Sequence, residues 1–374
     1  MTEDIAESVL ARPEIVEYLR DAEADGDALT TRARVYAYLE ELRTTQRPAF
    51  YRALQHPLYP ILRKIEKVPE GIDHVQAAVA AHRVMYASNH RSHTDYLVQP
   101  IVLDDHGIRP PLIAAGINLF GGPLGLIHRH VTGAIPIRRS MKDPAYLITL
   151  KAYIAELLQR QDVFFYPEGG RSYSGELKPA KTGLINAALA ARRQDLVVIP
   201  TAIAYDFVLE DHILARQKTK KRQRPFSHEV AEMARFAVGY RSRAIVTFGA
   251  PIAMQSFDAE SRSDAVELTR LLRAHIGAQV KVVPTSLFCA AMRPSIGRDA
   301  LVDRIDRLVA TVAAQPSNLD LTRGADVVDA AAEALDARGI IAIEDGHFRV
   351  RERHVLRYYA RTIEHLTGPV PRDF

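Results

Sequence analysis

The sequence contains a single cysteine, Cys289, in 374 residues. An internal disulfide is therefore impossible, and a chain of this length can bury a core large enough to fold without one. Cys289 lies in an apolar run from Thr285 to Met292, where a buried thiol is expected rather than a nucleophile. A reducing compartment is the natural environment for such a chain.

Long apolar runs are also missing. No stretch reaches the roughly 18 uninterrupted apolar residues that identify a membrane-spanning helix. The first residues, Met1 to Glu7, are acidic and lack the positive flank and apolar segment of a secretory signal. We therefore expect a cytoplasmic protein that is peripheral on the cytoplasmic face of the membrane.

Uncompensated charge occurs in one short segment. The formal net charge of the whole chain is +4. The segment from Arg216 to Arg224 contains six cationic side chains and no acid. Since the whole chain has a net charge of +4, the rest of the chain has a net charge of −2. Such a patch suits anionic lipid headgroups or an acidic carrier protein, and a solvated loop is the alternative. Nucleic acid is not an expected partner.

The pattern of apolar residues divides the chain into three parts. Residues 1–80 show helical periodicity, as in Ala33 to Leu42, and form an expected N-terminal helical region. Residues 81–284 alternate short apolar runs with longer helical patterns, which predicts an α/β domain. Residues 285–374 are again mainly helical, with a hairpin predicted around Asp345-Gly346. Strands are predicted at 84–88, 134–137, 163–166, 196–205 and 244–248, and helices at 144–159, 182–192, 300–314, 326–337 and 353–366.

One polar segment, Asn89 to Asp95, follows the first of these strands and precedes a helical run. On a continuous helix His90 and Asp95 would diverge by about 140°. A strand end followed by a turn instead lets the Asp95 carboxylate fold back onto one imidazole nitrogen. The carboxylate would fix the tautomer and stabilise the imidazolium, and the other nitrogen could take a proton from an alcohol. The alternative is a capped helix start, with Ser92 or Thr94 as the cap.

A second polar segment is a glycine-rich turn after the strand predicted at 163–166. It presents a carboxylate, two glycines, a guanidinium and a hydroxyl, at Glu168, Gly169, Gly170, Arg171 and Ser172. Paired glycines let backbone N–H groups approach an anion closely, and an arginine can hold a phosphate through two parallel hydrogen bonds. The turn is therefore a candidate phosphate site, with an ordinary turn and solvated charges as the alternative.

More cations lie near the same predicted edge of the sheet. Arg138 and Arg139 end the strand predicted at 134–137, and Lys178 and Lys181 follow the glycine turn. Alone, two arginines at a strand end indicate a solvated basic edge. Beside the glycine turn, these cations would add positive charge where a phosphate would sit.

The order of these segments resembles the glycerol-3-phosphate acyltransferases of the phospholipid acyltransferase superfamily, and the dihydroxyacetone-phosphate acyltransferases beside them. The resemblance covers about residues 80–366, and the four blocks of that family, including its HxxxxD motif, are matched by His90 to Leu97, Gly133 to Arg139, Glu168 to Ser172 and Ile199 to Tyr205. Pro136 stands where the family usually has an aromatic residue, Pro167 precedes the glutamate as in lysophospholipid acyltransferases, and Tyr173 replaces a common basic residue. These departures affect the identity of the acceptor more than the type of reaction.

The resemblance implies transfer of a fatty acyl group from an acyl thioester, either acyl-CoA or acyl carrier protein, to the sn-1 hydroxyl of glycerol 3-phosphate. The product would be lysophosphatidic acid, in the first step of phospholipid synthesis. His90 would be the general base, Asp95 its orienting partner and Glu168 a ligand of the glycerol hydroxyls. No metal and no cofactor beyond the co-substrate are implied. The implied substrate-binding residues are Arg138, Arg139, Glu168, Gly169, Gly170, Arg171, Ser172 and Lys181.

The implied fold is α/β, with a mixed, mostly parallel sheet flanked by helices and with helical additions at both ends. An apolar channel would hold the acyl chain, and the apolar residues of Leu112 to Leu126 are expected to line it or to contact the bilayer, with a buried core segment as the alternative. We expect backbone N–H groups near the helix start after His90 to stabilise the oxyanion.

Three alternatives stay open. The nearest is acylation of dihydroxyacetone phosphate or lysophosphatidic acid in place of glycerol 3-phosphate. A remote alternative is a metal-dependent phosphohydrolase with His90, His93 and Asp95 as ligands, since such side chains can hold Zn²⁺. The third is a non-catalytic protein that binds lipid or a carrier.

Overall fold

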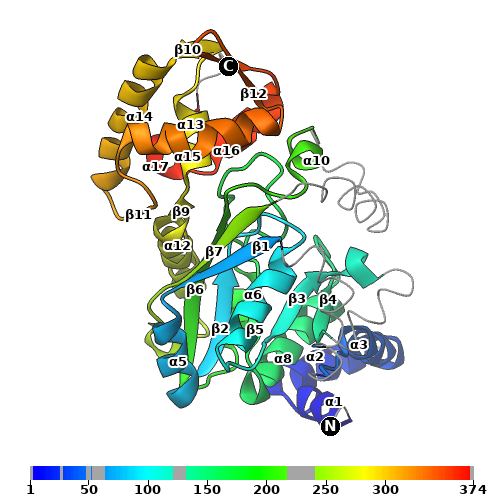
Figure 1. The fold of residues 1–374 in the computed structure, drawn as a ribbon. Helices are drawn as coiled ribbons and strands as arrows, with labels where there is room; N and C mark the ends of the chain where they lie inside the picture. The colour runs from blue at the N-terminus through cyan, green and yellow to red at the C-terminus, as the bar shows by residue number, and fades with distance from the viewer. Residues whose placement is uncertain are drawn as a thin grey trace.

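The structure is a computed structural model of the chain, and it describes residues 3–25, 28–47, 52, 64–120, 132–216 and 241–370. Within these ranges, eight strands form one mixed sheet in the order β1-β7-β6-β2-β5-β3-β4, and β8 pairs with β6 (Figure 1). The strands are β1 (Ile65–Glu70), β2 (Arg83–Ser88), β3 (Leu112–Gly116), β4 (Ala134–Ile137), β5 (Val163–Phe165), β6 (Leu196–Tyr205), β7 (Ser242–Phe248) and β8 (Ile252–Ala253).

The strands of the block β6-β2-β5-β3-β4 run parallel to one another. Strand β7 is antiparallel to β6 and parallel to the edge strand β1, and β8 is antiparallel to β6. The predicted fold class, a mixed and mostly parallel sheet flanked by helices, is confirmed. Because the carboxyl ends of parallel strands meet at one edge of a sheet, this block brings several loops together there.

Both faces of the sheet are covered. In β2, Val84 and Tyr86 belong to one hydrophobic cluster, whereas Met85 and Ala87 belong to the other. All ten residues of β6 are buried. Continuous apolar strands of this kind are typical of parallel sheets with helices on both sides. The helices of this part are α5 (Ile72–Ala81), α6 (Asp95–Asp105), η1 (Ile117–Phe120), α8 (Pro144–Arg160), α9 (Gly183–Leu189), α10 (Asp211–Arg216), η2 (Met254–Ser256) and α12 (Arg262–Gln279).

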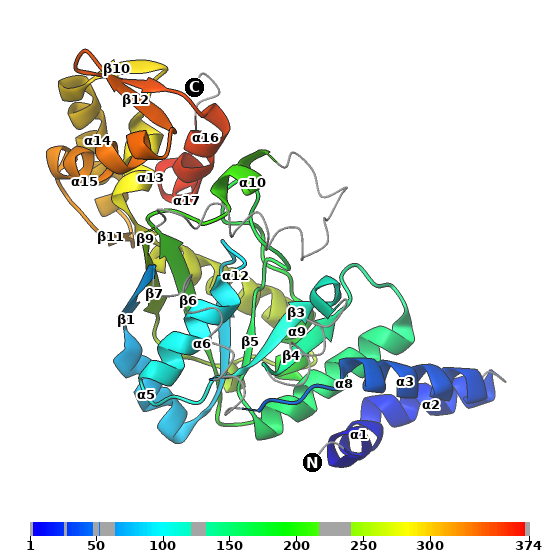
Figure 2. The ribbon, with the colours of Figure 1, turned by 45° about the vertical axis from the view of Figure 1, so that its right-hand side comes forward.

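Three N-terminal helices lie beside α8, as Figure 2 shows. They are α1 (Glu3–Leu10), α2 (Pro13–Ala24) and α3 (Ala28–Leu42). The Tyr38 hydroxyl on α3 donates to Asp143 Oδ2 at 2.5 Å, and Asp143 also caps α8 by accepting from the Ala145 N–H. The helical region therefore contacts the same strand end that carries Arg138 and Arg139.

The C-terminal part stands beyond one end of the main sheet, coloured yellow to red in Figure 1. Its helices are α13 (Pro284–Ala291), α14 (Arg298–Ala313), α15 (Gly324–Ala337), α16 (Arg353–Arg361) and α17 (Glu364–Thr367), and its strands are β9 (Lys281–Val282), β10 (Ser295–Gly297), β11 (Asn318–Leu319), β12 (Ile341–Glu344) and β13 (His347–Val350). Strands β10-β13-β12 form one small sheet and β11-β9 another. Cys289 is buried, and burial raises the pKa of its thiol.

Several local predictions were wrong. Residues 65–70, expected to be helical, form β1, and residues 112–116 form β3. The helix predicted at 353–366 is divided into α16 and α17, and α12 was not predicted. Of the predicted basic segment, Arg216 ends α10 and pairs with Glu352, and the rest lies outside the described residues.

None of the helices in the described ranges combines the length and the apolar content that a bilayer crossing requires.

Candidate active site

The predicted polar segments converge at the carboxyl edge of the parallel block. His90 follows β2, the glycine turn follows β5, and Arg138 and Arg139 follow β4. Tyr205 is the last residue of the neighbouring strand β6. Ligands of open α/β sheets bind outside this edge, so the fold places these side chains where a substrate site is expected.

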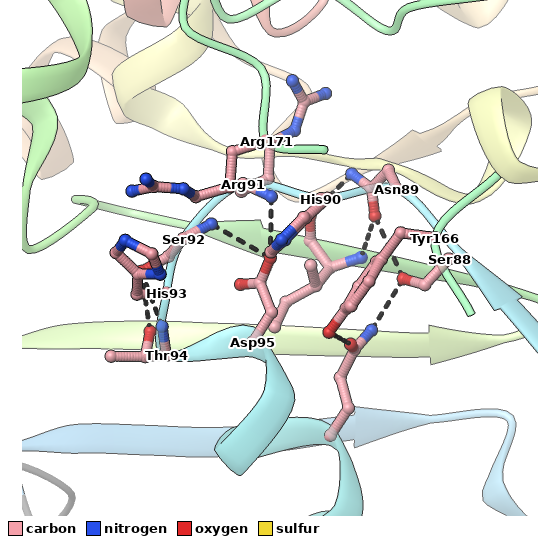
Figure 3. Close-up of polar contacts among 12 residues, drawn as sticks. Ser88, Asn89, His90, Arg91, Ser92, His93, Thr94, Asp95, Tyr166 and Arg171 are labelled. Carbon is pink, nitrogen blue, oxygen red and sulfur yellow. Dashed lines mark hydrogen bonds and ion pairs between the residues drawn. The ribbon is translucent and has the colours of Figure 1, made fainter. Parts of the chain in front are cut away.

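His90 and Asp95 are in direct contact (Figure 3). His90 lies in the turn after β2, and Asp95 is the first residue of α6, fully buried. Asp95 Oδ2 accepts from His90 Nδ1 at 2.8 Å and from the N–H groups of Arg91 and Ser92 at 2.7 and 3.0 Å. Asp95 Oδ1 accepts from the Tyr205 hydroxyl at 2.8 Å. The carboxylate is thus held from both sides and cannot rotate away from the imidazole.

This contact fixes the protonation of the imidazole. A carboxylate can only accept, so Nδ1 carries the proton and Nε2 of the neutral ring is the acceptor. Burial lowers the pKa of His90 to about 4, against the opposing effect of Asp95. At neutral pH the ring is therefore uncharged and able to accept a proton through Nε2. This is the protonation state that a general base requires.

The imidazole is also fixed by stacking. The Tyr166 ring lies parallel to the His90 ring, with centroids 3.9 Å apart and an interplanar angle of 13° (Figure 3). The Tyr166 hydroxyl donates to Gln99 Oε1 at 3.2 Å, and Gln99 Nε2 donates to Ser88 Oγ at 2.7 Å. The stacked ring is thereby tied to α6 and to the end of β2.

The glycine turn is joined by its backbone to the loop between β2 and α6, residues 89–94, called the histidine loop below. The N–H of Ser172 donates to the carbonyl of His90 at 3.0 Å. Lys178 Nζ closes the turn from behind by donating to the carbonyls of Gly170 and Arg171. The two loops are therefore bonded to each other.

The two glycines make room for cations. Gly169 has φ +69°, and a Cβ there would lie 2.7 Å from Lys181 Nζ. At Gly170 a Cβ would lie 3.1 Å from Arg139 Nη1. Glycine therefore lets a lysine and an arginine from other segments approach the backbone of the turn, and this arrangement suits an anionic group.

A pocket of about 480 Å³ opens at this edge, a size typical of small-molecule sites. Its polar side includes His90, Arg139 and Lys181, together with Gly169 and Gly170. Apolar side chains from β3, β4, β5, α8 and α9 line the remainder, among them Ile113, Ile137, Phe165, Leu150 and Leu184. The site therefore joins a proton acceptor and cations to an apolar cavity.

The implied substrate-binding residues do not all face this pocket. Arg138 lines it, but its guanidinium is held by Glu41 of α3 through two hydrogen bonds of 2.5 and 2.6 Å. Glu168, Arg171 and Ser172 are buried and do not belong to the lining. Burial raises the pKa of Glu168, whose Oε1 has no hydrogen-bond partner among the described residues.

The stretch Leu112 to Leu126 lines the pocket in part. Ile113 to Gly116 of β3 contribute to the wall. Residues 121–126 lie outside the described residues.

The expected oxyanion donors are engaged elsewhere. The N–H groups of Arg91 and Ser92 donate to Asp95 Oδ2, that of Thr94 to Ser92 Oγ, and that of His93 to Glu210 Oε1. The prediction that these N–H groups stabilise the oxyanion is therefore not supported by the structure.

Tyr205, Gln99 and Glu210 were missed as site residues by sequence reasoning. Tyr205 ends a segment that was predicted as a strand and as a family block, with no role for its side chain, and the other two lie in stretches with no polar motif.

In the part of the chain that the structure describes, no group of three or more His, Cys, Asp or Glu side chains is placed to hold a metal ion. Both oxygens of Asp95 are occupied by hydrogen bonds from protein groups. This arrangement does not favour the metal-site alternative for His90, His93 and Asp95.

The part of the chain that carries this site is similar to known proteins. The model of the family described as Acyltransferase matches residues 62–204, which include the histidine loop, the glycine turn and most of β6. The glycerol-3-phosphate acyltransferase of Glaesserella parasuis serovar 5 is 29% identical over 330 residues, which are 77% of this chain and 40% of that protein.

Other relatives match over shorter or similar stretches. The glycerol-3-phosphate acyltransferase of Aeromonas hydrophila is 35% identical over 189 residues, 49% of this chain and 23% of that protein. The chain spans about two fifths of the length of the first of these relatives. A solved 1-acyl-sn-glycerophosphate acyltransferase from Thermotoga maritima matches with a TM-score of 0.35 and 16% identity, covering 66% of this chain and 80% of that one.

Proposed function

We propose that the chain transfers a fatty acyl group from an acyl thioester to the sn-1 hydroxyl of glycerol 3-phosphate, giving lysophosphatidic acid. The observation that carries the proposal is the His90–Asp95 pair at the wall of a pocket that is cationic on one side and apolar on the other. The relatives that carry the name glycerol-3-phosphate acyltransferase support the choice of acceptor.

The reaction follows from the protonation state of the imidazole. His90 Nε2 takes the proton of the sn-1 hydroxyl while that oxygen attacks the thioester carbonyl carbon. The Asp95 carboxylate, on Nδ1, stabilises the imidazolium that forms. The tetrahedral intermediate then collapses, the carbon–sulfur bond breaks, and the imidazolium returns its proton to the leaving thiolate. Such a base contributes about 10²- to 10⁴-fold, and orientation of the two substrates must supply much of the rest.

The two halves of the pocket suit the two substrates. Arg139 and Lys181, beside Gly170 and Gly169, form the cationic side that receives the acceptor phosphate. The apolar wall from β3, α8 and α9 receives the acyl chain, whose burial is favourable by about 0.8 kcal/mol per CH₂. Arg171, a buried residue of the glycine turn that contacts Glu210, supports the phosphate site without lining the pocket.

The donor is an acyl-CoA or an acyl carrier protein, and no further cofactor enters the proposed reaction. Peripheral contact with an anionic membrane belongs to the same proposal, because residues 217–224, which follow the paired Arg216, contain five cations and no acid in sequence. Each such cation contributes about 1 kcal/mol near an anionic surface. Sedimentation with anionic and neutral vesicles at low and high salt tests this part, and equal binding to both vesicle types would remove it.

The test of the proposed function is a product assay by mass spectrometry. Purified protein is offered glycerol 3-phosphate, dihydroxyacetone phosphate and lysophosphatidic acid in parallel, each with acyl-CoA and with acyl carrier protein. The proposal expects lysophosphatidic acid from glycerol 3-phosphate as the dominant product. Faster acylation of dihydroxyacetone phosphate or lysophosphatidic acid would assign the acceptor to one of the two alternatives, and no acyl transfer with any pair would contradict the proposal.

A further inference from the structure

A buried carboxylate outside the predicted motifs lies against both loops of the site. Glu210 directly precedes α10, and only 2% of its surface is exposed. It is more than a hundred residues from the histidine loop in sequence and lies beyond the stretch that the family model matches. A buried carboxylate is costly unless its oxygens are satisfied, so its partners indicate what it does.

The first partners of Glu210 belong to the histidine loop. Its Oε2 accepts from the Ser92 hydroxyl at 2.8 Å, and its Oε1 accepts from the His93 N–H at 2.7 Å. Ser92 also gives its own N–H to Asp95 Oδ2. Glu210 therefore holds the turn that carries the proton acceptor and its orienting carboxylate.

The remaining partner is a cation of the glycine turn. Arg171 Nη1 lies 3.4 Å from Glu210 Oε1, and both side chains are buried. The Arg171 guanidinium also lies over the Tyr173 ring, with its carbon 5.6 Å from the ring centroid. One carboxylate oxygen thus bridges the histidine loop and the arginine behind the proposed phosphate site.

The side chain of the next residue, Asp211, contacts the C-terminal part instead of the two loops. Its Oδ2 accepts from the Tyr359 hydroxyl and from Arg338 Nη2, both at 2.6 Å, and both donors belong to the C-terminal part. Tyr359 also accepts from the N–H of Val208 at 2.9 Å. The side chain of Asp211 therefore bonds to the C-terminal part, whereas that of Glu210 bonds to the two loops of the site.

We infer that Glu210 is a positioning residue that couples the acceptor-phosphate site to the histidine loop through Arg171 and Ser92. The inference rests on the proposed function, because it takes the acceptor to be a phosphorylated alcohol. Without the negative charge, Arg171 loses a buried counter-charge, and an amide in its place can accept only one of the two hydrogen bonds from Ser92 and His93. Both the affinity for the phosphate and the rate of the chemical step then fall.

The test compares Glu210→Gln with Arg171→Lys and with the double variant. Glu210→Gln keeps the shape but removes the charge, so the acceptor KM, and the Kd for glycerol 3-phosphate measured by calorimetry without donor, should rise about tenfold, a loss of about 1.4 kcal/mol. The KM for the acyl donor should stay unchanged, and kcat should fall. Because both residues act through one contact, the double variant should be no worse than the more impaired single variant. Glu210→Asp, which keeps the charge, should recover part of the affinity.

A matched control is Asp211→Asn, which removes the adjacent buried charge and should lower Tm without changing the Kd for glycerol 3-phosphate. Unchanged acceptor affinity and kcat in folded Glu210→Gln, or additive losses in the double variant, would overturn the inference and leave the proposed function intact. If Glu210→Gln does not fold, the same assays are made on Ser92→Ala, which removes the hydroxyl that donates to Glu210. A normal kcat for Ser92→Ala would also overturn the inference. Failure of the wild-type protein to bind glycerol 3-phosphate would instead remove the proposed acceptor, and the inference with it.

Discussion

Replacing Asp95 by Asn is the most informative single change in the proposed dyad. The substitution keeps the shape and an oxygen that can still accept from His90 Nδ1, so the imidazole can keep its tautomer. The amide NH₂ then faces the Tyr205 hydroxyl, which can rotate to accept from it. What is lost is the negative charge beside the imidazolium that forms during the reaction.

The geometry sets the size of the expected effect. Charges about 4 Å apart interact by about 4 kcal/mol at an effective dielectric constant of about 20, which corresponds to a rate factor of up to about 10³. The transition state carries only part of the full charge, so we expect kcat to fall by about 10²-fold or more. The acceptor KM should change little, because Asp95 is fully buried and lies outside the pocket lining.

The assay is steady-state acyl transfer to glycerol 3-phosphate, with thermal unfolding followed by circular dichroism. Asp105→Asn is the matched control, because it makes the same chemical change at the exposed end of the same helix. The control should behave like the wild-type protein. A folded Asp95→Asn protein with kcat within about threefold of wild type would refute the proposed role of the carboxylate.

Three further predictions concern the surroundings of the base. Tyr166→Phe should keep most of kcat because the stacked ring remains, whereas Tyr166→Leu should lower kcat by about tenfold; equal rates for the two variants would show that the stacking has no role. Arg139→Lys should raise the acceptor KM about tenfold with the donor KM unchanged, since lysine cannot reproduce the bidentate geometry; a donor-specific defect would place Arg139 against the donor phosphates instead. NMR should show His90 titrating near pH 4 in the folded protein. Because the unfolded imidazole binds its proton more tightly, the free energy of unfolding should fall as pH drops from about 6.5 to about 4. Titration of folded His90 at or above pH 6.5 would contradict the argument that burial lowers its pKa.

Most of the central sheet could be predicted because its strands are short apolar runs that end in polar turns. Strand β6, from Leu196 to Tyr205, is buried at every position and therefore has a continuous apolar sequence. Strand β1 was missed because it is an edge strand, contains Pro69, and has charged residues such as Glu66 and Lys67. Its sequence has neither the apolar run nor the alternation on which strand prediction relies.

The contact between His90 and Asp95 could be foreseen because both residues lie in one short turn, so local geometry decides whether they meet. The partners Tyr205 and Glu210 could not, since each comes from a segment more than a hundred residues away and is brought in by the order of strands in the sheet. The burial of Arg171 against Glu210 also depends on that packing. A motif therefore identified the reacting groups, and only the fold identified the groups that hold them.

The central claim is that His90 is the base that activates the acceptor alcohol. The most direct measurement is the rate of lysophosphatidic acid formation from glycerol 3-phosphate by wild-type protein, His90→Ala and His106→Ala, a control on the C-cap of the same α6 helix. The account predicts that His90→Ala folds with a similar Tm and loses at least about 10²-fold in kcat, while His106→Ala keeps its rate. Near-normal turnover by folded His90→Ala would contradict the account.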